Sequence, residues 1–144
     1  MIHDTFWLTA NDRSQVFVNQ WLPEGPLKAV ILISHGMAEH SARYARLAEQ
    51  LCNQGYGVYA LDQRGHGQTP ATEGAYSMDD LADDAAELIR AQGAGPVHFV
   101  GLSMGGMTAQ ALAARHPERV RSIVIANSAA SYNEAARQMW QARI

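Results

Sequence analysis

The feature that most constrains this chain is the pentapeptide 101–105, Gly-Leu-Ser-Met-Gly, which stands between two different kinds of apolar pattern. The preceding residues, 96–100, are typical of a buried strand, and the following residues, 104–115, have the spacing of a helix. A serine on so tight a strand-to-helix turn takes a strained backbone conformation and exposes its hydroxyl. Glycine is needed on either side of it because bulk there would collide with the neighbouring backbone. The pattern therefore indicates that Ser103 is a nucleophile.

Two other interpretations of the same turn are weaker. The serine could simply cap the helix that begins at residue 104, in a glycine-rich turn without chemistry. A dinucleotide-binding turn is disfavoured, because that fingerprint needs glycine where Ser103 stands. In the nucleophile interpretation, the free N–H groups and the positive dipole end of the helix suit a developing oxyanion.

The composition is that of a globular domain of 144 residues, of which 47% are hydrophobic. A net charge of −3 with mixed signs argues against a nucleic-acid surface. The single cysteine, Cys52, excludes a disulfide framework and is expected to be a small buried apolar residue. The N-terminus is polar and no run approaches 18 apolar residues, so we expect no transmembrane segment and a cytoplasmic protein.

The order of the predicted elements indicates an α/β fold. A hairpin is followed by strands that alternate with helices, which predicts a mostly parallel sheet with helices on both faces and an antiparallel start. The predicted strands are 5–9, 16–21, 29–33, 57–61, 96–100 and 120–126, and the predicted helices are 41–54, 78–91, 104–115 and 129–144. In such a sheet the functional loops lie at the carboxyl ends of the strands.

The loop 34–40 leaves one of these carboxyl ends and has the sequence Ser-His-Gly-Met-Ala-Glu-His. We expect the backbone N–H of Met37 to donate to the oxyanion together with the backbone N–H of Met104. For His35 and His40, hydrogen bonding that stabilises the loop is favoured over catalysis. A metal site is disfavoured, since no third ligand follows at a typical spacing.

The loop 62–67, Asp-Gln-Arg-Gly-His-Gly, leaves another strand and is favoured as a structural turn rather than a direct participant in chemistry. We expect Asp62 and Arg64 to form an ion pair and His66 to lock the turn.

Taken together, these residues resemble the α/β-hydrolase superfamily over about residues 5–144. The stretch 5–67, with its His-Gly-Met-Ala-Glu-His and Asp-Gln-Arg-Gly-His-Gly motifs, looks most like monoacylglycerol lipases and lysophospholipases. The stretch 76–144 looks more like 3-oxoadipate enol-lactonases, and Leu102 stands where the lipase group would have histidine. Both resemblances imply hydrolysis of a small carboxylic ester or lactone by Ser103, with no metal or organic cofactor.

The resemblance also implies a catalytic acid and a histidine after later strands, and no histidine follows position 116. His116 lies in the turn at the far end of the elbow helix, and His98 lies within the strand before it. Neither is placed to take the Ser103 proton. The chain is therefore interpreted as the N-terminal portion of a single α/β-hydrolase domain, truncated after the sixth strand at a possible start of the lid.

Two classes of function follow. In the first, the complete protein is a serine esterase of the monoacylglycerol or lysophospholipid type, or an enol-lactone hydrolase, and this chain alone is inactive. In the second, the chain is an inactive binding or interaction module on a hydrolase scaffold. In either case, the apolar edge strand 120–126 invites a second copy or a complementing C-terminal fragment.

Overall fold

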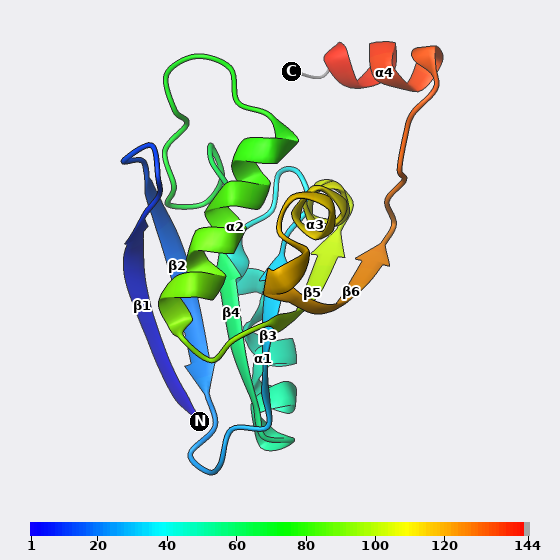
Figure 1. The fold of residues 1–144 in the computed structure, drawn as a ribbon. Coiled ribbons are helices and arrows are strands. Elements are labelled where there is room, and N and C mark those ends of the chain that lie inside the picture. The colour runs from blue at the N-terminus through cyan, green and yellow to red at the C-terminus, as the bar shows by residue number, and fades with distance from the viewer. Residues whose placement is uncertain (143–144) are drawn as a thin grey trace.

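The computed structural model describes residues 1–142 as a single six-stranded sheet with helices on both faces (Figure 1). The strand order is β1-β2-β4-β3-β5-β6. The strands are β1 (Ile2–Thr9), β2 (Gln15–Leu22), β3 (Ala29–Ser34), β4 (Tyr56–Leu61), β5 (Val97–Leu102) and β6 (Val120–Ala126). β1 and β2 are antiparallel, β2 pairs antiparallel with β4, and the remaining pairs are parallel. The predicted fold class is confirmed.

The helices are η1 (Ser41–Tyr44), α1 (Ala45–Asn53), α2 (Met78–Gln92), α3 (Met104–Arg115), η2 (Pro117–Arg119) and α4 (Glu134–Gln141). α2 has the sequence signals of both ends, since Ser77 and Asp80 form a capping box and Gly93 ends the helix in the left-handed region. Between residues 41 and 54, one α-helix was predicted, but the first turn is a 3-10 turn and the α-helix begins at Ala45.

Two cores lie on opposite faces of the sheet. Side chains alternate along each strand, so residues of β3 such as Leu32 pack with α2 and α3, whereas its Ile31 and Ile33 pack with α1. Cys52 of α1 is 5% exposed and belongs to the second core, as predicted. Burial raises the pKa of its thiol, which suits a packing role.

The prediction of one helix over 129–144 is wrong at its start. The segment after β6 is irregular to residue 133, and α4 begins at Glu134, where the side chain of Asn133 accepts the backbone N–H of Ala136 at 2.9 Å. Residues 143–144 lie outside the described part of the chain. Figure 1 shows α4 set apart from the sheet, beyond the carboxyl end of β6.

Candidate active site

Ser103 lies at the junction of β5 and α3, with φ 53° and ψ −112°. A positive φ is unfavourable for a residue with a side chain, so this conformation is strained and must be held by its surroundings. Three hydrogen bonds hold it: the Ser103 N–H donates to Ala126 O at 2.9 Å, and Ser103 O accepts the N–H groups of Gly106 at 2.9 Å and of Met107 at 3.2 Å. The chain therefore makes the strained strand-to-helix turn that the sequence predicts.

The flanking glycines are required by contacts between backbone atoms. A Cβ on Gly101 would lie 2.1 Å from Gly105 O, and a Cβ on Gly105 would lie 2.0 Å from Ser34 O. Real Cβ atoms do not approach so closely. The predicted collision at both positions is confirmed, and Gly105 is where α3 touches the end of β3.

The register of the sheet brings the loop after β3 to Ser103. Ser34 is the partner of Gly101 across the parallel pair β3–β5, so the residues that follow each strand emerge side by side. A Cβ on Gly36 would lie 3.4 Å from Ser103 Cβ. The first N–H groups of α3 have no partner within the helix. The oxyanion roles of the Met37 and Met104 N–H groups stay a prediction.

His35 is fully buried, and its hydrogen-bond partners determine which ring nitrogen carries the proton. Its Nδ1 lies 2.7 Å from Gly36 O, an acceptor, and its Nε2 accepts the backbone N–H of Gln63 at 2.9 Å. The ring is therefore neutral, with the proton on Nδ1. Burial lowers the pKa of His35, against the opposite effect of the bond to Gly36. The predicted loop-stabilising role is the one that these contacts describe.

Glu39 holds the other side of Gly36. Its Oε2 accepts the Gly36 N–H at 3.3 Å and the Tyr44 hydroxyl at 3.0 Å, and its Oε1 lies 3.3 Å from Arg43 Nη1. Burial and the bond to this carboxylate raise the pKa of Tyr44 to about 12. Both the N–H and the carbonyl of Gly36 are therefore fixed. No motif in the sequence assigns Glu39 a role, because its partners follow from the path of the loop.

The predicted ion pair between Asp62 and Arg64 is wrong. The carboxylate of Asp62 accepts the N–H of Ser41 at 2.7 Å, the Ser41 hydroxyl at 2.6 Å and the Gln68 N–H at 2.8 Å. Arg64 instead reaches Asp84 of α2 and Asp12 of the β1–β2 hairpin. Side chains two residues apart in an irregular loop can point in opposite directions, so their spacing did not define the partners.

The remaining histidines of the described chain have structural partners or lie away from Ser103. His66 Nδ1 lies 3.0 Å from Arg64 O, which confirms that His66 locks its turn. His98 Nδ1 lies 2.7 Å from Ser122 Oγ on β6, and His116 Nε2 lies 2.7 Å from Asp83 Oδ1 on α2. His116 follows the last residue of α3, about 20 Å along the helix from Ser103 at 1.5 Å per residue. His40 precedes η1 and is exposed.

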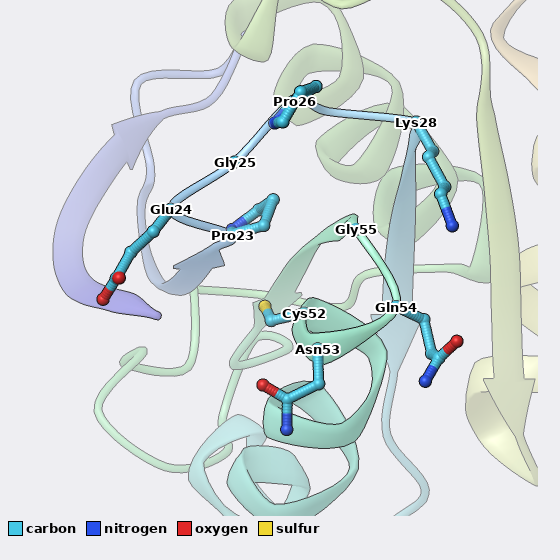
Figure 2. Close-up of a pocket in the computed structure, with 9 residues that line it drawn as sticks. All are labelled: Pro23, Glu24, Gly25, Pro26, Lys28, Cys52, Asn53, Gln54 and Gly55. Atoms are coloured by element: carbon cyan, nitrogen blue, oxygen red, sulfur yellow. The ribbon is translucent and has the colours of Figure 1, made fainter.

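A groove at the opposite end of the sheet does not belong to this site (Figure 2). Its lining comes from the loop before β3 and the turn before β4, so it lies at the amino ends of the strands. Its residues are Pro23, Glu24, Gly25, Pro26, Lys28, Cys52, Asn53, Gln54 and Gly55. Loops at the carboxyl ends, where Ser103 lies, are the functional ones in a parallel sheet.

Within residues 1–142 there is no helix long and apolar enough to cross a bilayer. The same residues contain no group of three or more His, Cys, Asp or Glu side chains that could hold a metal ion.

Residues 25–143 match the family model described as serine aminopeptidase, S33, which is named Hydrolase_4. The chain belongs to this family of α/β-hydrolases. Over 88 residues it is 42% identical to 3-oxoadipate enol-lactonase 2 of Acinetobacter baylyi, covering 61% of this chain and 32% of the lactonase. Over 119 residues it is 34% identical to human monoglyceride lipase, covering 79% of this chain and 39% of the lipase.

The structural comparison agrees with the family. The crystal structure of E-2-(acetamidomethylene)succinate hydrolase has a TM-score of 0.85 and 31% identity to this chain. That match covers 99% of this chain and 51% of the hydrolase. The chain thus spans about half the length of this solved structure and 32–39% of the two curated relatives.

Proposed function

We propose that Ser103 is the nucleophile of a serine hydrolase that cleaves carboxylic esters of the monoacylglycerol or lysophospholipid type. The single observation that carries the proposal is the strained conformation of Ser103, φ 53°, with the Gly36 loop packed against it. The strain must be offset by the surrounding fold, and the first N–H groups of α3, which have no partner within the helix, follow Ser103 directly.

In the proposed reaction, Ser103 Oγ attacks the ester carbonyl carbon while its proton passes to a base. The backbone N–H groups of Met37 and Met104 stabilise the oxyanion of the tetrahedral intermediate. The carbon–oxygen bond to the alcohol then breaks, the alcohol leaves with the proton, and water releases the acid from the acyl-serine.

The base and its orienting acid are proposed to come from residues outside this chain, in one domain of which residues 1–144 are the N-terminal portion. The contacts of four histidines support this, because the cited ring nitrogens of His35, His66, His98 and His116 are bonded to groups other than Ser103. We therefore expect the 144-residue chain alone to be inactive.

An enol-lactone hydrolase is the second candidate, and the 42% identity to the Acinetobacter baylyi lactonase favours it. A lactone is an internal ester, so the same nucleophile and oxyanion donors would serve, and the opened acid would keep its alcohol or enol portion. The monoacylglycerol-type esterase is favoured by a different observation, the 34% identity to human monoglyceride lipase, which extends over 119 residues rather than 88.

The experiment is labelling with a fluorophosphonate probe in the whole protein that carries this chain. We expect labelling of the parent and of Ser128→Ala, a control serine next to α3, and none of Ser103→Ala. Equal labelling of parent and Ser103→Ala would exclude Ser103 as the nucleophile, and no labelling of either protein would leave the interaction module as the better explanation. Comparison of kcat/KM for a monoacylglycerol and an enol-lactone then separates the two hydrolases.

A further inference from the structure

Gln63 is a buried polar side chain that the proposed chemistry does not use. It is 1% exposed and follows the end of β4, in the loop 62–67. Its side-chain Nε2 donates to His35 O at 2.6 Å, and its backbone N–H donates to His35 Nε2 at 2.9 Å. One residue therefore fixes both the main chain and the ring of His35.

The same side chain reaches the elbow helix. Its Oε1 lies 3.1 Å from the hydroxyl of Thr108, which is 1% exposed and lies one turn into α3. That hydroxyl is also 3.1 Å from Met104 O, so its one proton lies between two acceptors. Gln63 thus connects the loop after β3 to the first turn of α3 through buried polar contacts.

His35, which Gln63 holds by its backbone N–H at the ring and by its side chain at the carbonyl, acts on one particular peptide group. The carbonyl that the His35 ring holds, Gly36 O, belongs to the same peptide as the Met37 N–H. No peptide bond of the described chain is cis, and in a trans peptide the carbonyl and the N–H point in opposite directions. Fixing Gly36 O therefore fixes the direction of the Met37 N–H.

We propose that Gln63 is a positioning residue that, through His35 and Thr108, sets the spacing between the Met37 and Met104 N–H groups. This rests on the proposed function, in which those groups hold the oxyanion. Gln63 touches no substrate in this scheme. Its effect is to keep two donors on separate elements at the separation that a tetrahedral oxyanion needs, since a displacement of about 1 Å at such a site can lower the rate about 10²-fold.

A purely structural role is the alternative, because any buried amide must be hydrogen-bonded. The two roles differ in what they change. Loss of a structural contact lowers the free energy of unfolding and leaves the turnover of the folded protein unchanged. Loss of positioning lowers kcat while KM, which reports ground-state binding when chemistry is slow, stays nearly constant.

The first test is Gln63→Met in the whole protein, which fills the same volume and removes both side-chain hydrogen bonds. We expect kcat for an ester to fall about 10–100-fold with KM within about twofold. The matched control is Thr69→Val, which removes a buried hydroxyl that accepts the backbone N–H of Phe17 near the start of β2. It should lower stability and leave kcat unchanged. A folded Gln63→Met protein with the parent kcat would overturn the proposal.

The second test uses the other end of the connection and decides the matter if Gln63→Met does not fold. Thr108→Val should lower kcat and Thr108→Ser should restore it, since serine retains the hydroxyl. A trifluoromethyl ketone, which forms an oxyanion on the enzyme, should bind Thr108→Val about tenfold more weakly, whereas its carbinol analogue should bind equally well. Equal changes for both compounds, or none for either, would contradict positioning.

The failure of this inference can be told from that of the proposed function. If Ser103→Ala hydrolyses esters at the parent rate, the nucleophile assignment fails and the Gln63 variants are no longer relevant to an oxyanion. If hydrolysis depends on Ser103 but kcat survives both Gln63→Met and Thr108→Val, only the positioning role is excluded.

Discussion

Arg64 and Asp84 form a buried ion pair with two hydrogen bonds, which joins the loop after β4 to the middle of α2. Arg64 Nε donates to Asp84 Oδ2 and Nη2 donates to Oδ1, each at 2.7 Å. The two side chains are 5% and 4% exposed. These bonds hold the pKa of Arg64 above its usual value, so the guanidinium stays charged. A third bond, from Nη1 to Asp12 Oδ2 at 2.6 Å, adds the β1–β2 hairpin.

Replacement of Asp84 by Asn should be strongly destabilising, because it removes the buried carboxylate that faces the Arg64 guanidinium and leaves only Asp12, whose side chain is 51% exposed. We expect the free energy of unfolding to fall by about 3–5 kcal/mol, measured by urea denaturation. Glu87→Gln on the same helix is the control, since Glu87 pairs with the exposed Arg90 and should matter much less. Similar losses of free energy of unfolding for the two variants would show that the buried Arg64–Asp84 pair contributes no more to stability than the exposed Glu87–Arg90 pair.

Gly105→Ala should prevent correct folding of the elbow, because the new Cβ would lie 2.0 Å from Ser34 O with only backbone able to move. We expect no cooperatively folded soluble protein, as judged by thermal unfolding followed by circular dichroism. Gly25→Ala is the control: a Cβ there meets nothing within 4 Å, and φ is not positive. It should leave stability unchanged or slightly increased. A Gly105→Ala protein with parent stability would contradict the close contact of β3 and α3.

Stability should decrease as the pH falls below 6.5, the ordinary pKa of histidine. Burial lowers the pKa of His35 in the folded chain, so below 6.5 the unfolded chain binds a proton that the folded chain does not. Above 6.5 this contribution is fully present and does not change with pH. His66, Asp62 and Glu39 are the titratable groups that act on the ring.

The measurement is the free energy of unfolding from pH 5 to pH 8 for the parent and for His35→Asn. The variant should be less stable throughout and should show a smaller decrease at acid pH. An identical pH dependence in the two proteins would assign the acid sensitivity to other groups.

The 144-residue chain on its own should associate through the free edge and faces of β6. Ile123, Val124 and Ile125 are 36%, 54% and 40% exposed. Each apolar side chain left in water forgoes about 1.5–3 kcal/mol of burial, and an unpaired edge offers backbone groups to a second chain. We expect species larger than a monomer by size-exclusion chromatography with light scattering.

Val124→Lys should shift that chain towards the monomer, since a charge on an edge strand opposes pairing. Val124→Thr, of similar shape and without charge, is the control and should associate more than the lysine variant. A parent chain that elutes as a monomer at all concentrations would contradict association through the edge of β6 and favour a self-sufficient module.

The sequence could predict most of the fold because the relevant signals are local. A continuous apolar run identified β3, and glycines bracketed Ser103. Element ends were less predictable. The strands extend one to three residues beyond several predicted limits, because pairing with a neighbour continues where the apolar pattern stops.

The polar contacts of the site could not be predicted in the same way. Arg64 lies 20 residues from Asp84 and 52 from Asp12, and Gln63 lies 45 from Thr108. Contacts at such separations follow from the way that β4, α2 and α3 pack, so no spacing in the sequence encodes them. The buried state of Gln63 was the missing signal, and it becomes visible only once the cores are assembled.

The contact of Gly105 with Ser34 O joins the turn of Ser103 to the end of β3 by backbone alone. The side chains around this junction, such as Met37, which is 42% exposed, are free to vary without moving the strands beneath them. The geometry for bond cleavage and the selection of the molecule to be cleaved are thereby separate properties of the chain. A scaffold divided in this way can acquire a new substrate by exchanging surface residues while its glycines keep the nucleophile in place.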